Sequence, residues 1–229
     1  MTATVPVTVP VRAWPEGLAL ALQDLRSLAG VTVIGVATPV SADRTTARTQ
    51  VRSVLRETLA QLLDQPAASI TWVSRPGQAI AVESSPVPLG LSISHAPGLS
   101  VVAIGRGAAL GVDLMRMEHG VDDAPDWPRV AADYLGPAVA AALHKRPASQ
   151  RQTTFIQAWT RHEAGLKCLG LGLTEWSPAL GQQLATCRVL TLDFTDPSLA
   201  WIATGARWVG AIALRVNKLS HTGHATDAG

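Results

Sequence analysis

Cysteine, aromatic residues and long apolar runs are all scarce in this chain of 229 residues. The two cysteines, Cys168 and Cys187, are too few for a disulfide framework, and no CxxC or Cys/His cluster indicates zinc. We expect both thiols to be buried as small hydrophobic groups, with a reactive thiol as the alternative. No apolar run approaches the roughly 18 residues of a membrane span, and the N-terminus lacks the pattern of a signal peptide. The sequence therefore predicts a cytoplasmic protein with no membrane partner.

The charge balance and the aromatic content also argue against a nucleic-acid partner. Nineteen Lys+Arg and seventeen Asp+Glu leave a net charge of +2, which is too small for binding driven by phosphate neutralisation. One tyrosine and two phenylalanines offer few rings for base stacking. In contrast, 47% hydrophobic residues against 16% charged ones predict a globular chain with a substantial core.

Hydrophobic periodicity predicts alternating helices and strands. Expected helices cover 18–28, 43–63, 128–144 and 151–169, and expected strands cover 31–38, 69–74, 89–95, 99–105, 109–115, 188–194, 199–205 and 206–216. Residues 1–17 are expected to be an extended lead-in.

Two segments of the chain have a similar form. LSISHAPGLSVVAIG (91–105) and LAWIATGARWVGAIAL (199–214) each suggest a strand, a turn and a second strand ending in Ala-Ile. Each follows a long helix, so we predict an α+β fold of two similar α/β halves related by pseudo-two-fold symmetry. The expected divisions are 1–108, 109–216 and a flexible tail, 217–229, in which His221 and His224 are solvated rather than a metal pair.

Asp113 lies in an otherwise apolar strand, GVDLM (111–115). Side-chain alternation would bury Val112 and Leu114 and place Asp113 and Met115 together on the other face. A carboxylate in that position suits a hard cation such as Mg²⁺. The alternative is an Asp that forms a strand-end turn or a helix cap.

Two helices carry the remaining candidate residues. Phe155, Trp159, Glu163 and Lys167 recur every four residues along one helix, so they lie on one face. The alternative for Glu163 and Lys167 is a surface ion pair. The helix 43–63 carries a second set at the same spacing, which is either a solvated face or an anion-binding stripe: Arg44, Arg48, Arg52 and Arg56.

Three motifs in this order resemble the 4′-phosphopantetheinyl transferase superfamily. GVDLM resembles its G-(V/I)-D-(L/I)-E strand, and WTRHEAGLKCLGLGL (159–173) resembles its W-(S/T)-x-K-E-A-x-x-K-x-x-G-x-G-L helix. Ser94-His95 resembles its N-x-SHS element, with Ser92 where Asn is usual. The resemblance covers roughly residues 40–215 and is closest to the long, single-chain, Sfp-like type, which implies a monomer built of two related halves.

This resemblance implies a Mg²⁺- or Mn²⁺-dependent enzyme that moves the phosphopantetheine arm of coenzyme A onto a serine of an acyl or peptidyl carrier protein. Adenosine 3′,5′-bisphosphate would be released, and coenzyme A would lie in the cleft between the two halves. Asp113 and Glu163 match the metal-binding carboxylates, Glu163 also matches the proposed base, and Lys167 matches the lysine that stabilises the departing phosphate. Ser94 and His95 match contacts to the coenzyme A phosphates, and Arg44 and Arg48 suit its 3′-phosphate.

The sequence departs from the family pattern at three places. Met115 stands where many long members have a third acidic ligand, and a thioether binds Mg²⁺ poorly; Glu118 has the wrong strand parity to replace it. Arg161-His162 replaces the usual x-Lys before the glutamate. Gln78 stands where a Gly-Lys-Pro lysine is typical, and Arg75 is the candidate that compensates for it.

Two other functions remain as alternatives. One is a catalytically impaired family member that only binds coenzyme A or a carrier protein, which Met115 favours and the joint presence of Asp113, Glu163 and Lys167 disfavours. The other is an unrelated metal-dependent phosphotransferase or hydrolase, although no GxxxxGK[ST] or HExxH motif is present.

Overall fold

The computed structural model describes residues 8–27, 30–38, 40, 44–73, 80–117, 127–203 and 207–216. The strands are β1 (Thr8–Ala13), β2 (Val31–Ala37), β3 (Trp72–Val73), β4 (Ile80–Val82), β5 (Leu89–Ala96), β6 (Leu99–Arg106), β7 (Ala108–Met117), β8 (Arg188–Asp193) and β9 (Arg207–Val216). The helices are α1 (Leu18–Arg26), α2 (Arg44–Leu63), α3 (Trp127–Val130), α4 (Pro137–His144), α5 (Ala148–Leu169) and α6 (Pro178–Leu184). Short 3-10 turns, η1 (Ala67–Ser69) and η3 (Pro197–Ala203), and a π-helical turn, η2 (Ala131–Leu135), complete the described elements.

The nine strands of the described residues join in one mixed sheet, in the order β3-β4-β5-β6-β2-β1-β8-β9-β7. Most neighbours are antiparallel, but β1 pairs in parallel with both β2 and β8. The two pairings use different parts of β1: Thr8–Pro10 pairs with β8, and Val11–Ala13 pairs with β2. One short strand therefore connects an N-terminal group of strands to a C-terminal group.

The two groups share a strand order. In the first, β6 lies between β2 and β5, and in the second, β9 lies between β7 and β8, all in antiparallel pairs. Each group thus contains a first strand, a long helix (α2 or α5) and a hairpin whose second strand returns to the first. A duplicated unit would have this shared strand order. The two-fold axis and the division at residue 108 remain predictions.

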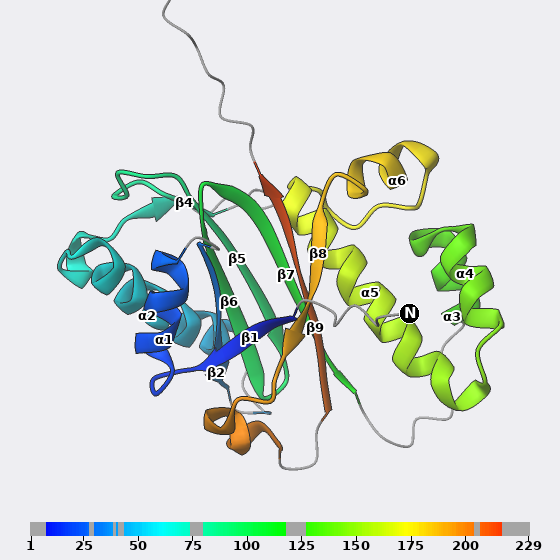
Figure 1. The fold of residues 1–229 in the computed structure, drawn as a ribbon, viewed down its shortest axis with the longest axis horizontal. Helices are drawn as coiled ribbons and strands as arrows, with labels where there is room; N and C mark the ends of the chain where they lie inside the picture. Colours follow the sequence, from blue (N-terminus) through cyan, green and yellow to red (C-terminus); the bar gives the residue numbers. More distant parts are fainter. Residues whose placement is uncertain are drawn as a thin grey trace, which may run out of the picture.

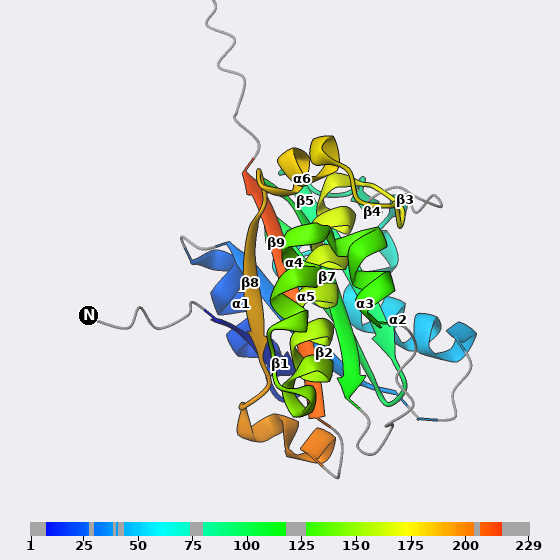
Figure 2. The same ribbon diagram turned by 90° about the vertical axis from the view of Figure 1, so that its right-hand side faces the viewer.

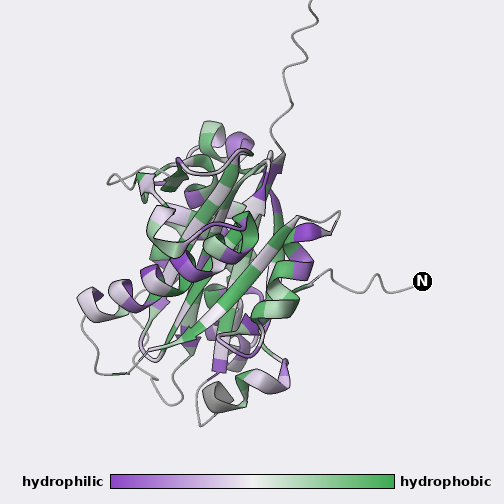
Figure 3. Cartoon of the chain, turned by 90° about the vertical axis from the view of Figure 1, so that its left-hand side faces the viewer, coloured by the Kyte–Doolittle hydropathy of each residue, from purple (hydrophilic) through white to green (hydrophobic). Residues whose placement is uncertain are grey.

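The helices cover opposite faces of the sheet. Figure 1 shows α1 and α2 against the N-terminal strands and α3 to α6 against the C-terminal strands, and Figure 2 shows α3 to α6 from their own side. Side-chain alternation builds the layers: Ile34 and Val102 face the α1–α2 layer, whereas Val33 and Val101 face the core between the two groups of strands. In Figure 3 the hydrophobic colour follows the strands, and hydrophilic residues gather on the helices. Among the described residues, no helix combines the length and the apolar character needed to cross a bilayer.

Two expectations about secondary structure were wrong, and a third was incomplete. Residues 199–203 belong to the 3-10 turn η3 instead of a strand, because the Asp196 carboxylate accepts hydrogen bonds from the Ser198 amide (2.9 Å) and hydroxyl (2.6 Å) and begins a helical turn. The hairpin partner of β9 is therefore β8. The expected helix 128–144 is interrupted at Gly136, whose φ of +89° precedes the Pro137 that begins α4. The lead-in contains β1, a central strand of the sheet.

The two cysteines lie together between α5 and the C-terminal strands. Cys168 is buried, donates a hydrogen bond to the Ala109 carbonyl (3.3 Å) and packs with Cys187 against Ala211 and Ala213. Burial, with a further contribution from Cys187, raises the pKa of Cys168 to about 12. A thiol with so high a pKa is a weak nucleophile at neutral pH.

Candidate active site

The outer edge of β7 is closed by serine side chains. Strand β7 is the last strand of the sheet, and its edge lies against the face of β5. The Val112 amide donates to Ser92 Oγ (3.0 Å), and the Leu114 amide donates to Ser94 Oγ (3.2 Å). Both serines are at least nine-tenths buried. These two bonds attach the strand that carries Asp113 to the N-terminal group of strands.

Lys167 comes to the same edge from α5. Its Nζ lies 2.7 Å from Asp113 Oδ1, 3.1 Å from the Val112 carbonyl oxygen and 3.5 Å from Ser94 Oγ. Asp113 Oδ1 also accepts the Ser94 hydroxyl at 3.0 Å. Only 8% of Asp113 is exposed, so its charge is balanced by Lys167 rather than by water.

The close approach of α5 to β7 depends on Gly111. A Cβ on Gly111 would overlap the Ala164 carbonyl oxygen and the Cys168 amide nitrogen, and would lie 2.7 Å from Lys167 Cβ. Glycine is thus required for the backbone of β7 to lie directly against the helix that carries Lys167.

Glu163 lies one helical turn before Lys167 and is half-buried. Burial raises its pKa, the Asp113 carboxylate raises it further, and Lys167 opposes this shift. The two carboxylates and the ammonium therefore share one electrostatic environment. The expected juxtaposition of Asp113, Glu163 and Lys167 is present in the structure, whereas their catalytic roles stay predictions.

His95 follows Ser94 on β5, and its Nδ1 forms a 2.8 Å hydrogen bond with Ser100 Oγ. Burial lowers the pKa of His95, and the positive charges of Arg48, Lys167 and Arg44 lower it further. Three cations thus act on the same histidine, and with burial they favour its neutral form. Such a group of cations is suited to hold an anion with several negative charges.

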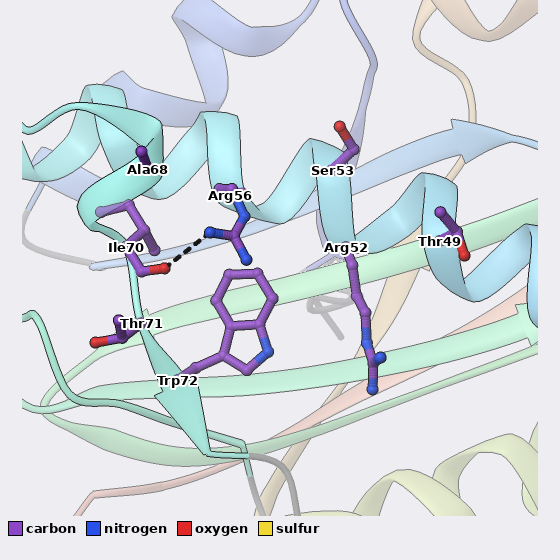
Figure 4. Close-up of a pocket in the computed structure, with 8 residues that line it drawn as sticks. All are labelled: Thr49, Arg52, Ser53, Arg56, Ala68, Ile70, Thr71 and Trp72. Atoms are coloured by element: carbon purple, nitrogen blue, oxygen red, sulfur yellow. Dashed lines mark hydrogen bonds between the residues drawn. The ribbon is translucent and has the colours of Figure 1, made fainter.

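Beyond Arg48 on α2, Arg52 and Arg56 line a cavity of about 570 Å³. Its other lining residues are Thr49, Ser53, Ala68, Ile70, Thr71 and Trp72. The Arg56 guanidinium lies 4.6 Å from the centre of the Trp72 ring and donates to the Ile70 carbonyl oxygen at 3.1 Å, while Arg52 extends beside the indole (Figure 4). A cavity with an indole, hydroxyl groups and a guanidinium suits a polar aromatic ligand with phosphate groups.

The carboxylates of Asp113 and Glu163 fit a hard divalent cation whose coordination is completed by other ligands. Within the described residues, no group of three or more His, Cys, Asp or Glu side chains could hold a metal ion. Asp113 and Glu163 supply oxygen donors, and a cation between them would relieve the repulsion that raises the pKa of Glu163. Substrate oxygens and water would have to complete the coordination.

Some of the residues that depart from the family pattern are described by the structure, and others lie outside the described residues. Met115 packs beside the apolar cluster that contains Met117 and Phe155. His162 is buried, burial lowers its pKa, and its Nε2 has no hydrogen-bond partner among the described residues; Arg161 is exposed. The expectations for Arg75, Gln78, Glu118 and the two tail histidines lie outside the described residues.

Sequence reasoning missed three features of this site. It noted Ser92 only as a departure from asparagine, it did not pair Ser100 with His95, and it did not find the cavity at Arg52 and Trp72. The continued four-residue spacing from Arg44 to Arg56 was the one signal for the cavity. The serine contacts join residues about twenty positions apart and need the bend of the sheet, which no local pattern reveals.

Replacing Ser92 by Ala should lower the free energy of unfolding by about 2 kcal/mol, because the buried Val112 amide would lose its acceptor. Urea denaturation measures the change. Ser53→Ala is the matched control, since Ser53 is exposed and its hydroxyl donates to Glu57 in the same helix. A Ser92→Ala protein as stable as the control would show that the serine does not hold the edge of β7.

Comparison with known proteins adds two findings. The chain is similar to the "Uncharacterized protein DR1" of Human herpesvirus 6A (strain Uganda-1102), with 26% identity over 142 residues. That alignment covers 54% of this chain and 21% of the viral protein, so the chain spans about a fifth of the length of this relative. Residues 109–215 match the model of the 4′-phosphopantetheinyl transferase superfamily. This range contains Asp113, Glu163 and Lys167, and it runs from the second residue of β7 to the next-to-last residue of β9.

Proposed function

We propose that this protein transfers the 4′-phosphopantetheine arm of coenzyme A to a serine hydroxyl of an apo carrier protein. The observation that carries the proposal is the meeting of Asp113, Glu163 and Lys167 with Ser94 and His95 at the edge of β7. The family match covers only the C-terminal part of the chain, whereas the serine and the histidine come from β5 in the N-terminal part. Both parts thus contribute to one site.

The cationic side of the site would hold coenzyme A. Arg44, Arg48 and Lys167 surround His95, and a pyrophosphate bridge together with a 3′-phosphate carries the negative charge that such a group attracts. Arg52 lies one further helical turn along α2, at the cavity with Trp72. We assign this cavity to the adenosine end of coenzyme A, because guanidinium groups bind phosphate and can also stack on a base.

Asp113 and Glu163 would hold Mg²⁺ or Mn²⁺. The bound cation would neutralise charge on the pyrophosphate and on the phosphate that departs. Met115 contributes no oxygen ligand, so the protein supplies two carboxylates where many long family members supply three. A lower affinity for Mg²⁺ than in those members follows from this difference.

The reaction exchanges one phosphorus–oxygen bond for another. The carrier serine oxygen attacks the β-phosphorus, and the bond from this phosphorus to the bridging oxygen breaks. Adenosine 3′,5′-bisphosphate leaves with the bridging oxygen and the electron pair of that bond. Glu163 accepts the serine proton, and Lys167 balances the charge that develops on the departing phosphate.

The test is to incubate the protein with coenzyme A, Mg²⁺ and several apo carrier proteins of fatty-acid, polyketide and nonribosomal peptide synthesis. Mass spectrometry should show that a carrier gains one phosphopantetheine arm, and that a carrier whose acceptor serine is replaced by alanine does not. Binding of coenzyme A without transfer to any carrier would instead favour a catalytically impaired binding protein.

A further inference from the structure

The ammonium group of Lys167 is fully engaged at the edge of β7. A lysine ammonium has three N–H donors, and Lys167 Nζ lies within 3.5 Å of three acceptors: Asp113 Oδ1, the Val112 carbonyl oxygen and Ser94 Oγ. The shortest of these contacts, 2.7 Å, is to the carboxylate. Lys167 must therefore give up at least one partner before it can bind a phosphate oxygen.

The charges at this edge do not cancel. Asp113 and Glu163 bring two negative charges, and Lys167 is the cation that contacts Asp113 directly. Arg44 and Arg48 are exposed, and their charges act on His95. A divalent cation at Asp113 would change the sum for these three residues from −1 to +1, and would repel an ammonium bonded to the same carboxylate.

We propose that Lys167 is an exchangeable counter-ion of Asp113, which a divalent cation displaces from the carboxylate so that the ammonium becomes free for the substrate phosphate. This inference rests on the proposed function, because it takes the same carboxylate as the metal ligand. Lysine is suited to the exchange, since it carries a point charge on a flexible stem of four carbons and can move while its Cβ stays packed against β7. Arginine, with its rigid planar fork, would not exchange partners as simply.

Cation binding and the Lys167–Asp113 bond are coupled, because both use the Asp113 carboxylate. If cation binding weakens the Lys167–Asp113 bond, then this bond must weaken cation binding by the same factor. Loss of the lysine charge should therefore tighten the binding of a divalent cation, although the same change removes a group that the reaction needs. A lysine that does not contact Asp113 would have a smaller effect on cation binding, because the repulsion between two charges falls with distance.

Binding of Mn²⁺ alone, in the absence of coenzyme A, tests the proposal through the electron paramagnetic resonance signal of the free ion. At pH 8 and low salt, Lys167→Met should bind Mn²⁺ about fivefold more tightly than the wild type, or more. Lys145→Met is the matched control, because it removes the same charge from an exposed position at the end of α4 and should leave the affinity unchanged. An unchanged or weaker affinity in a folded Lys167→Met protein overturns the proposal.

A second measurement does not need Lys167 to be replaced. The chain has only three lysines, at positions 145, 167 and 218, so Lys145→Arg combined with Lys218→Arg leaves one side-chain ammonium for NMR. This ammonium signal should be protected from water exchange without Mg²⁺ and should shift or disappear when Mg²⁺ saturates the site. Sodium chloride at matched ionic strength is the control. A signal that Mg²⁺ leaves unchanged, while Mn²⁺ binds, contradicts the exchange.

Transfer activity of the wild type separates this inference from the proposed function. If the wild type modifies a carrier protein but Lys167→Met binds Mn²⁺ no more tightly, the counter-ion exchange is wrong and the function stands. If Lys167→Met binds Mn²⁺ more tightly but the wild type modifies no carrier, the exchange stands and the function is wrong. A wild-type protein that does not bind Mn²⁺ contradicts both the metal assignment and the exchange.

Discussion

Glu163→Gln and Asp113→Asn should each lower the rate of phosphopantetheine transfer by about a thousandfold or more. Both substitutions keep the size of the side chain and remove its negative charge. For Glu163 the loss removes the proposed proton acceptor and one oxygen ligand of the cation. For Asp113 it removes the carboxylate to which Lys167 and Ser94 bond. The measurement is the initial rate of mass gain on a carrier protein at saturating Mg²⁺ and coenzyme A.

Two exposed residues provide controls with the same chemistry. Glu175→Gln and Asp133→Asn remove a carboxylate charge outside the site and should leave the rate within about twofold of the wild type. Circular dichroism should show that all four variants fold. A folded Asp113→Asn or Glu163→Gln protein that keeps more than about a tenth of the wild-type rate would remove that residue from the catalytic assignment.

Gly111→Ala should destabilise the protein by about 3 kcal/mol and lower its melting temperature by roughly 6–12 °C. The added methyl group would meet backbone atoms of α5, which cannot rotate away as a side chain can. The helix would have to move from β7, and Lys167 would move away from Asp113 with it. We therefore expect a loss of transfer as well as of stability.

Gly172→Ala is the control for this substitution. No atom lies within 4 Å of the position that a Cβ would take there, so the added methyl group meets no obstacle. Calorimetry should find the melting temperature of Gly172→Ala close to that of the wild type. If Gly111→Ala melts within about 2 °C of this control, α5 and β7 are not in tight contact.

The helices and most strands follow from local patterns. Hydrophobic periodicity predicts α2 and α5, and short runs of mostly apolar residues predict β2, β6 and β7. Local patterns misidentify residues 199–203, because an apolar side chain such as that of Leu199 can be buried from a helical turn as well as from a strand. They also do not show that β1 lies in the centre of the sheet, since its partners are set by the packing of the complete chain.

Some of the residues of the candidate site could be predicted from the sequence, but the distances between them could not. Asp113, Glu163, Lys167 and the Ser94-His95 pair stand in short motifs, and the structure brings these motifs together. The distances between them depend on Gly90 and Gly111, at which the backbones of β5, β7 and α5 meet. The sequence alone does not reveal at which glycine a side chain would clash, because the clash depends on the elements that the glycine contacts.

The divided pairing of β1 has a consequence for the order in which the molecule forms during synthesis. The second half of β1 pairs with β2, which follows within about twenty residues, whereas the first half pairs with β8, which begins at Arg188. A growing chain thus holds Thr8–Pro10 without this strand partner until Arg188–Asp193 has left the ribosome. Thr8–Pro10 is therefore made long before its partner, so its open backbone is available to other chains, or to a chaperone, while the residues between β1 and β8 are synthesised.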